Sequence, residues 1–199
     1  YIISLSQLCR GLANYAEELG IEIYPGFAAV SPIIENNIVV GVITGDMGVD
    51  KNGSHTLNYQ PGVELRAKQI VIAEGCRGSL AQQIIQYFKL NQSALPQTYG
   101  LGIKEVWQID HKLHEQGKVI HCIGYPLNNN AYGGGFLYEY DNNLVAVGLV
   151  TALDYENPYL NPYEEFQKFK AHPTIKSVLM GGKRIEYGAR TVVEGGIQA

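Results

Sequence analysis

Cysteine is scarce in this sequence, and its spacing excludes the sites that cysteine usually builds. The three cysteines, Cys9, Cys76 and Cys122, lie far apart, and no C-x-x-C pair occurs. Such spacing provides neither a disulfide framework nor the ligands of a zinc or iron–sulfur site, and it is typical of a reducing compartment. We therefore expect no metal site built from these residues.

Long apolar runs and an excess of positive charge are also missing. No segment approaches the roughly 18 apolar residues of a membrane-spanning helix, and the longest candidate, residues 144–153, has the pattern of a buried strand. The net charge is −4, and the densest basic group is the pair Lys183-Arg184. We therefore expect no binding to nucleic acid, and membrane contact only of the peripheral kind.

The first half of the chain has the pattern of an α/β domain with a β insertion. Apolar residues at helical spacing predict a helix over residues 4–19, which Gly20 ends. Strands are predicted at residues 21–24, 27–34, 38–44 and 56–65, with a hairpin turn at Asn36-Asn37. A continuous β-branched run at residues 69–73 predicts a strand buried on both faces, and a helix follows at residues 79–88.

From Pro96 onward the pattern is that of an antiparallel sheet with one helix. Strands are predicted at residues 99–107, 119–123, 135–140 and 144–151. A helix over residues 162–170 begins with Asn161 as its N-cap and Pro162 in its first turn. The change of pattern places a domain boundary near residues 91–95.

The first segment that could carry chemistry is residues 70–78, IVIAEGCRG. A strand that ends in a glycine-containing loop at the start of a helix directs backbone N–H groups at one point, which favours an anion such as phosphate. Gly75 and Gly78 would let the backbone approach a pyrophosphate closely. An ordinary strand-to-helix turn explains the same residues equally well, and the complete G-x-G-x-x-G fingerprint is missing.

The second such segment is Tyr132-Gly133-Gly134-Gly135-Phe136. A quinone ring needs an apolar slot with one or two hydrogen bonds to its carbonyl oxygens, and glycine backbone between aromatic side chains supplies both. A flexible loop or a β-bulge is the competing explanation. No catalytic triad, carboxylate pair or nucleophile with a partner base is recognisable, so we predict no catalytic side chain.

Several stretches resemble one family, the electron-transfer flavoprotein–ubiquinone oxidoreductases. They are residues 96–107 (PQTYGLGIKEVW), 132–138 (YGGGFLY), 153–160 (LDYENPYL) and 181–185 (GGKRI), with YGAR at 187–190 and EGG at 194–196. The resemblance covers essentially the whole chain in colinear order. It implies electron transfer from reduced electron-transfer flavoprotein, through FAD and a 4Fe–4S cluster, to ubiquinone. It also implies peripheral attachment to the inner membrane, on the cytoplasmic face in a bacterium or the matrix face in a mitochondrion.

The resemblance further implies a fold and an organisation. The fold would be α/β plus α+β, part of a glutathione-reductase-type FAD-binding domain with an inserted antiparallel-sheet quinone-binding domain. Residues 1–92 would be the middle part of the FAD domain with its β insertion, residues 93–182 the quinone-binding domain, and residues 183–199 the return toward the FAD domain. We expect an internal fragment, inactive alone, whose cluster cysteines lie beyond Ala199; the opening without Met and the ending without a charged tail fit this expectation.

Site residues follow from the same resemblance. Residues Glu74, Gly75, Cys76, Arg77 and Gly78 match the family's second FAD-contacting loop, where relatives more often carry Asp-Gly, and we expect the backbone rather than the Glu74 carboxylate to make the contact. Main-chain contacts to adenine are expected at Ala28 and Ala29. The backbone of Gly133 and Gly134 is expected to hold the quinone carbonyl beside Tyr132, with Gly135 at a position that is often Ser.

Two other interpretations stay open from the sequence. An FAD-dependent hydroxylase or a prenyl-lipid reductase shares the β insertion and the glycine loop near the flavin. A lipid- or quinone-binding module without flavin is the non-enzymatic alternative. The segments 96–107 and 132–136 favour the quinone oxidoreductase over the hydroxylase or reductase, whereas the module without flavin would gain support if the parent protein lacked an upstream strand–G-x-G-x-x-G–helix segment.

Overall fold

The computed structural model describes residues 2–194, and the chain divides into two compact units. One unit consists of Tyr1–Leu19 with Gln97–Ala199, and the other of Gly20–Pro96. Each unit has its own sheets and is described by itself. The three-part division predicted above stays a prediction, and residues 195–199 of its last part lie outside the described residues.

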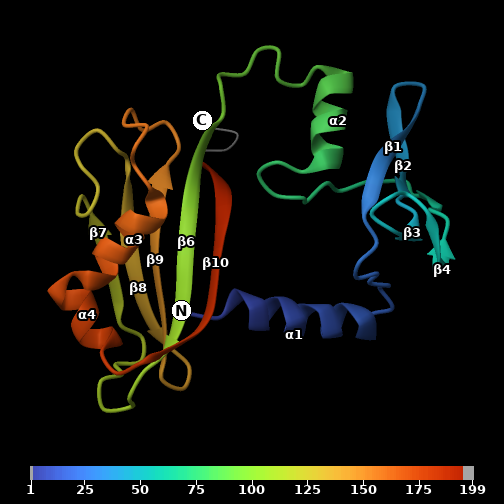
Figure 1. Cartoon of the computed structure of the whole chain (residues 1–199). Coiled ribbons are helices and arrows are strands. Elements are labelled where there is room, and N and C mark those ends of the chain that lie inside the picture. The colour runs from blue at the N-terminus through green and yellow to red at the C-terminus, as the bar shows by residue number, and fades with distance from the viewer. Residues whose placement is uncertain (1, 195–199) are drawn as a thin grey trace. The chain divides into compact units, whose positions relative to one another are not determined.

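The unit Gly20–Pro96 is built from two small antiparallel sheets and a helix (Figure 1). The sheets are β1 (Ala29–Glu35), β2 (Ile38–Thr44) and β5 (Glu64–Arg66), in the order β1-β2-β5, and the pair β3 (Met47–Val49) and β4 (His55–Gln60). Helix α2 (Ser79–Phe88) packs beside β1, where the Gln83 side-chain amide donates to the Val30 carbonyl at 2.8 Å. The hairpin turn at Asn36-Asn37 is confirmed, with φ values of 51° and 62°.

Two strands predicted in this unit are absent. Residues 21–24 and 69–73 carry no strand, and the side chain of Val71 is 82% exposed. A strand buried on both faces needs partner strands on both edges and layers above and below it. No described residue of this unit provides those partners, so the apolar run at 69–73 stays extended without pairing. The predicted strand at residues 56–65 is divided into β4 and β5, because Pro61 between them cannot donate to a ladder.

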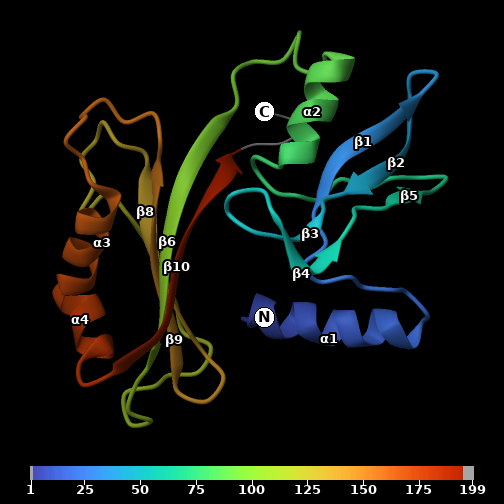
Figure 2. The ribbon, with the colours of Figure 1, turned by 45° about the vertical axis from the view of Figure 1, so that its right-hand side comes forward.

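The other unit is centred on a five-stranded antiparallel sheet (Figure 2). Its strands are β6 (Thr98–Gln108), β7 (Val119–Ile123), β8 (Gly133–Tyr140), β9 (Leu144–Ala152) and β10 (Lys183–Glu194), in the order β10-β6-β9-β8-β7. The first four confirm the predicted strands, with β8 beginning at Gly133 instead of Gly135. Strand β10 was not predicted, and it pairs with β6 along its length.

Two helices cover one face of this sheet (Figures 1 and 2). Helix α3 (Pro162–Ala171) begins as predicted, with the Asn161 side chain accepting from the Tyr163 N–H at 3.0 Å. The unpredicted helix α4 (Pro173–Leu179) follows at once, because a proline that ends one helix is well placed in the first turn of the next. The main core lies between these helices and the sheet and includes Leu137, Val145, Val147, Leu149, Phe166, Phe169 and Ile175.

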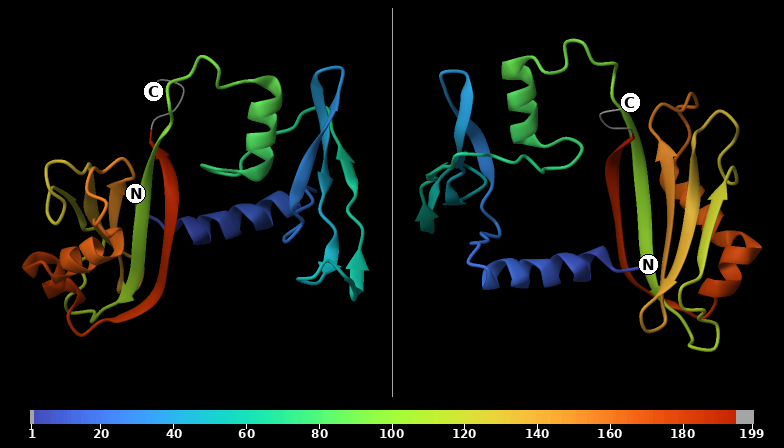
Figure 3. Two further views of the ribbon diagram at one scale, coloured as in Figure 1. Left: turned by 45° about the horizontal axis from the view of Figure 1, so that its top comes forward. Right: turned by 180° about the vertical axis from the view of Figure 1, so that it is seen from behind.

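The face of the sheet opposite α3 and α4 is here called the second face (Figure 3). Because side chains alternate along a strand, residues next to core positions point to it. Its buried cluster is small and consists of Val106, Tyr140 and Ala146, with Ile2 packed against it. Helix α1 (Leu5–Glu18), predicted at residues 4–19, belongs to this unit and is capped by Ser4, but none of its residues is buried.

Candidate functional site

The glycine segment lies in a strand and not in a loop. Gly133, Gly134 and Gly135 open β8, between β7 on one side and β9 on the other. Gly133 has a φ of +155°, a conformation that favours glycine. The competing explanation of a flexible loop is therefore wrong, because all three glycines pair with β9, and Gly134 and Gly135 also pair with β7.

The register decides where the backbone of each glycine points. The Tyr132 carbonyl accepts from the Ala152 N–H at 2.9 Å. Hydrogen-bonded pairs alternate along an antiparallel ladder, so the polar groups of Gly134 point to β9 and those of Gly133 point to the β7 side. Strand β7 ends at Ile123, opposite Gly134, and Gly133 therefore lies one position beyond the last β7 pair.

Close packing explains why three glycines stand here. A Cβ on Gly133 would overlap the Val150 carbonyl, one on Gly134 the Cys122 carbonyl, and one on Gly135 the ring of Phe169. The first two conflicts involve backbone, which cannot move without disturbing the sheet. The glycines thus bring β7, β9 and α3 close to the start of β8.

Aromatic side chains and a histidine surround Gly134 on the second face. Phe136 and Tyr138 alternate with the core positions of β8 and share this face, as does His121, the register partner of Phe136 on β7; Tyr132 directly precedes β8. The rings of Phe136 and Tyr138 stack with centroids 5.0 Å apart, and the Tyr138 hydroxyl lies 3.2 Å from His121 Nε2. Tyr132 is 73% exposed. The sequence pattern did not single out His121 or Tyr138, although strand alternation places them beside the glycines once the register is known.

Two pockets adjoin this part of the sheet. One, of about 330 Å³ and mostly apolar, lies between the end of β7 and the helices, and is lined by Cys122, Ile123, Tyr125, Phe169, His172, Thr174 and Ile175. The other, of about 240 Å³, lies on the second face, where Phe136, Tyr138, Lys104 and Val106 are among its lining residues. The pocket beside the end of β7 is lined mostly by apolar residues, whereas the second-face pocket also has Ser6, Lys104 and Glu186 in its lining.

The loop predicted to contact a flavin is organised around the Glu74 carboxylate. Its oxygens accept from the N–H groups of Leu80 at 3.2 Å and Ala81 at 2.6 Å, in the first turn of α2. This carboxylate occupies the position where a phosphate would meet the helix N-terminus. Gly78 leaves room for it, since a Cβ there would overlap the Glu74 side chain, and Gly75 takes a φ of +86°.

The remaining predicted cofactor residues have ordinary strand and loop positions. Ala29 begins β1, and the carbonyl of Ala28 accepts from the Gly45 N–H at 2.9 Å. Cys76 and Arg77 lie in the turn between Gly75 and α2. The structure thus brings residues 74–78 together as one loop in the unit Gly20–Pro96.

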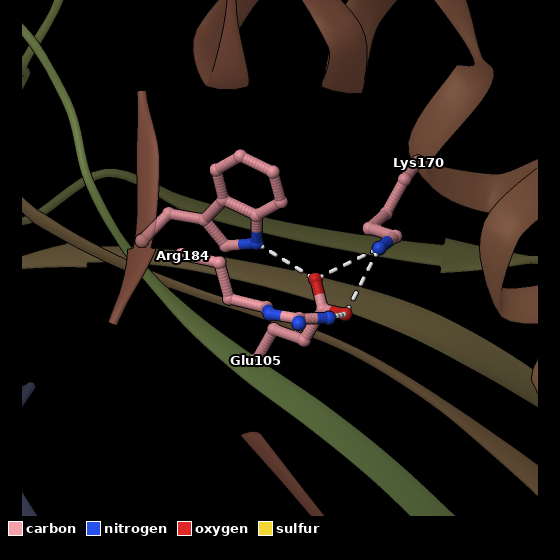
Figure 4. A network of polar contacts seen from close by, with 4 residues as sticks. Glu105, Lys170 and Arg184 are labelled. Carbon is pink, nitrogen blue, oxygen red and sulfur yellow. Dashed lines mark hydrogen bonds and ion pairs between the residues drawn. The ribbon is translucent and has the colours of Figure 1, made fainter. Parts of the chain in front are cut away.

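A buried ion network lies on the helix-covered face and was missed by sequence reasoning. Glu105 on β6 is 2% exposed and accepts from Lys170 Nζ at 2.8 and 3.0 Å, from the Trp107 indole N–H at 2.8 Å and from Arg184 at 3.2 Å (Figure 4). Burial alone would raise the pKa of Glu105, but these hydrogen bonds outweigh it and hold the pKa below its ordinary value. These hydrogen bonds connect α3 and β10 to β6.

The chain is similar to known proteins over its whole length. A family model described as the ubiquinone-binding region of ETF-QO matches residues 99–192. Over its whole length the chain is 52% identical to the electron transfer flavoprotein-ubiquinone oxidoreductase of Pseudomonas aeruginosa. It is 54% identical to the mitochondrial protein of the same name from Oryza sativa subsp. japonica and 47% to that from Homo sapiens. The chain belongs to the electron-transfer flavoprotein–ubiquinone oxidoreductase family. It spans about a third of the length of these relatives, 35%, 36% and 33% respectively.

Solved structures of other proteins share the fold of this chain. A flavin-dependent brominase matches with a TM-score of 0.59 at 14% identity, over 95% of this chain and 44% of its own. A geranylgeranyl bacteriochlorophyll reductase-like protein from Thermoplasma acidophilum matches with a TM-score of 0.59 at 16% identity, over 94% of this chain and 41% of its own. The mixed helix and sheet content is thus that of an α+β, flavoenzyme-related fold.

Two features of the described residues bear on metals and membranes. No cluster of three or more His, Cys, Asp or Glu side chains suited to a metal ion occurs within residues 2–194 of this family member. Within the same residues, no helix is long and apolar enough to cross a membrane.

Proposed function

We propose that this chain is the quinone-binding segment, together with part of the FAD-binding segment, of an oxidoreductase that passes electrons from reduced electron-transfer flavoprotein to ubiquinone. The electrons would travel through FAD and a 4Fe–4S cluster whose ligands lie outside this chain. The observation that carries the proposal is 47–55% identity to curated members over the entire chain. Peripheral contact with the inner membrane belongs to the same proposal, because the quinone is a lipid.

The quinone head group is proposed to bind where β7 ends beside β8. Gly133 offers backbone polar groups on the side that β7 no longer pairs, so a quinone carbonyl could hydrogen-bond there. Gly134, whose own polar groups point to β9, contributes by having no side chain between Tyr132 and Phe136 on the second face. Tyr132 is proposed as an aromatic wall of the site.

The residues proposed to contact FAD are Ala28, Ala29 and the loop Glu74–Gly78. The Glu74 carboxylate already accepts hydrogen bonds from the N–H groups at the N-terminus of α2. FAD would therefore contact the backbone along the loop, and its phosphates would not bind at the helix end. FAD, when bound, would supply the electron-transfer chemistry itself. This chain's part is to shape the loop through the Glu74 cap and the two glycines, Gly75 and Gly78.

The test uses the full-length protein that contains this segment, reconstituted with reduced electron-transfer flavoprotein and a short-chain ubiquinone. Gly133→Ala should lower the rate of quinone reduction by about 10-fold or more, because misplacing a bound group by an ångström costs up to about 100-fold. FAD content and reduction of the flavin by the donor should persist. Gly188→Ala is the matched control, since nothing lies within 4 Å of the Cβ that it adds to the same sheet.

Normal quinone reduction by Gly133→Ala would show that the segment is structural and that the site lies elsewhere. A wild-type protein that ignores reduced electron-transfer flavoprotein would overturn the proposed activity altogether. Consumption of NAD(P)H with a hydroxylated or hydrogenated product would favour the hydroxylase or prenyl-lipid reductase alternative, for which the present support is likeness of fold alone.

A further inference from the structure

Reduction of a quinone consumes protons as well as electrons, and the glycine segment supplies none. Two electrons and two protons convert a quinone to a quinol, with one new O–H bond at each oxygen. Glycine backbone can hold a carbonyl oxygen but cannot give up a proton at neutral pH. A group that transfers protons in this way must lie within hydrogen-bond reach of the bound ring, directly or through one water.

Only one imidazole lies on the sheet that carries the glycines. Among strands β6 to β10, His121 is the sole histidine. It stands on the edge strand β7, and Ile123, two residues further on, pairs with Gly134. At about 3.4 Å per residue, His121 lies about 7 Å along the strand from the level of Gly134 and about 10 Å from that of Gly133, a span that an imidazole, one water molecule and their hydrogen bonds can cover.

His121 is also held in place. Its Nε2 lies 3.2 Å from the Tyr138 hydroxyl, and the two rings are 5.4 Å apart. Tyr138 in turn stacks on Phe136. The tautomer of the imidazole decides which of the two groups donates in the hydrogen bond, and in either case Nδ1 is the nitrogen left for another partner. His121 is exposed, so its ring can take up protons from solvent.

The arrangement combines the parts of a proton-delivery site on one face. His121, Phe136 and Tyr138 share the second face with Gly134, and the Cys122 carbonyl next to His121 closely approaches Gly134. The other charged side chains on this face that register identifies stand on β6 and β10, across β8 and β9 from His121; they are Lys104, Lys183, Glu186 and Arg190. His121 is therefore the nearest exchangeable group on this face apart from tyrosine hydroxyls.

Resting on the proposed function, we propose that His121, oriented by Tyr138, is the proton donor to the quinone bound at the start of β8. The reductant is the reduced flavin of the same enzyme, which supplies both electrons. As they arrive, the N–H bond at His121 Nδ1 breaks and an O–H bond forms at the nearer quinone oxygen. The ring, protonated at the start, is left neutral and takes a proton back from solvent, and the second oxygen takes its proton from water. The two protons that the flavin releases on oxidation replace those that solvent has given up, so charge and atoms balance.

The experiment is made on the full-length enzyme with two electron acceptors. His121→Gln should lower kcat with a short-chain ubiquinone by about 100-fold, the lower end of the usual contribution of a positioned acid, while KM changes by less than about threefold. Electron transfer to ferricyanide, which accepts an electron without a proton, should stay at the wild-type rate. His111→Gln, a change in an exposed loop, is the matched control and should leave both rates unchanged.

Chemical rescue separates proton donation from a structural role. In His121→Ala, added imidazole should restore at least a tenth of the wild-type rate with ubiquinone and should not alter the rate with ferricyanide. Tyr138→Phe should lower kcat by a smaller factor, about 10-fold, because the imidazole is retained but less well oriented. Melting curves of each variant that match wild type confirm that the fold is intact.

Three results would overturn the inference. They are a His121→Gln enzyme within twofold of the wild-type kcat, an equal loss with both acceptors, and a loss that appears in KM alone without rescue by imidazole. Each leaves the proposed function standing if the wild-type enzyme reduces ubiquinone. A wild-type enzyme that fails to reduce ubiquinone instead refutes the proposed function first, and the inference with it.

Discussion

The ion network at Glu105 offers the most direct test of how this sheet is stabilised. The change is Glu105→Gln, which keeps the size of the side chain and removes its charge. The carboxylate is 2% exposed and accepts from Lys170, Trp107 and Arg184. After the substitution, the Lys170 ammonium, on a side chain only 14% exposed, has lost its counter-charge.

The expected loss can be estimated from these exposures. Removing one partner of a buried pair costs about 3–5 kcal/mol, because the other charge stays buried without compensation. Arg184 is 44% exposed and water screens it, so its share is below about 1 kcal/mol. Lys170 also lies over the rings of Trp107 and Phe166, at 5.6 and 4.8 Å, which retains part of its stabilisation. We expect a loss of about 3 kcal/mol in the free energy of unfolding.

The chain carries its own probe for this measurement. Trp107 is the only tryptophan, and its indole N–H donates to Glu105. Urea unfolding followed by tryptophan fluorescence therefore reports on the unit that contains the network. Lys168→Met is the matched control, since its pair with Glu165 is a surface pair of the kind that contributes under about 1 kcal/mol.

A double-mutant cycle and a pH series test whether the loss of stability in Glu105→Gln comes from the ion pair with Lys170. Lys170→Met combined with Glu105→Gln should lose less than the sum of the two single losses, by about 2 kcal/mol. Because the folded pKa of Glu105 is lowered, its stabilisation is present above the ordinary glutamate pKa and is lost as pH falls through the lower folded value. The difference between wild type and Glu105→Gln should thus shrink below about pH 4. Additive losses, or a difference that is independent of pH, would refute this reasoning.

Two further predictions concern the packing of the glycines and the completeness of the cofactor site. Gly135→Ala should lower the free energy of unfolding by about 1–3 kcal/mol, because the added methyl group displaces the Phe169 ring. The control Gly188→Ala, measured in the same urea titration, should change it by under about 0.5 kcal/mol. Equal effects of the two substitutions would show that the contact with Phe169 does not cause the loss. The 199-residue chain alone should show no quinone turnover and should lose FAD on gel filtration, since it spans about a third of its relatives; stoichiometric FAD retained through the column would contradict this.

Much of the local structure was predictable because its causes are local. Asn161 and Pro162 set the beginning of α3, Asn36-Asn37 made the hairpin turn, and alternating apolar residues marked β6 to β9 within two residues of their observed bounds. The strand predicted at residues 69–73 was wrong because its pattern describes burial that only partner strands could provide. Strand β10 was missed although residues 185–190 alternate, and its pairing with β6 joins residues that are 75 to 96 positions apart in the chain.

For the site, the sequence by itself determined the family and the glycine segment, since long colinear motifs carry that information without any coordinates. Only the tertiary structure decided what each glycine does: Gly133 lies past the end of β7, a Cβ on Gly133 or Gly134 would overlap backbone, and one on Gly135 would displace the Phe169 ring. It also brought His121 to Tyr138, and Glu105 to Lys170 and Arg184, from segments distant in the chain. Periodicity shows which face a side chain takes within its strand, but the register between strands, set by packing of the whole sheet, decides which side chains meet.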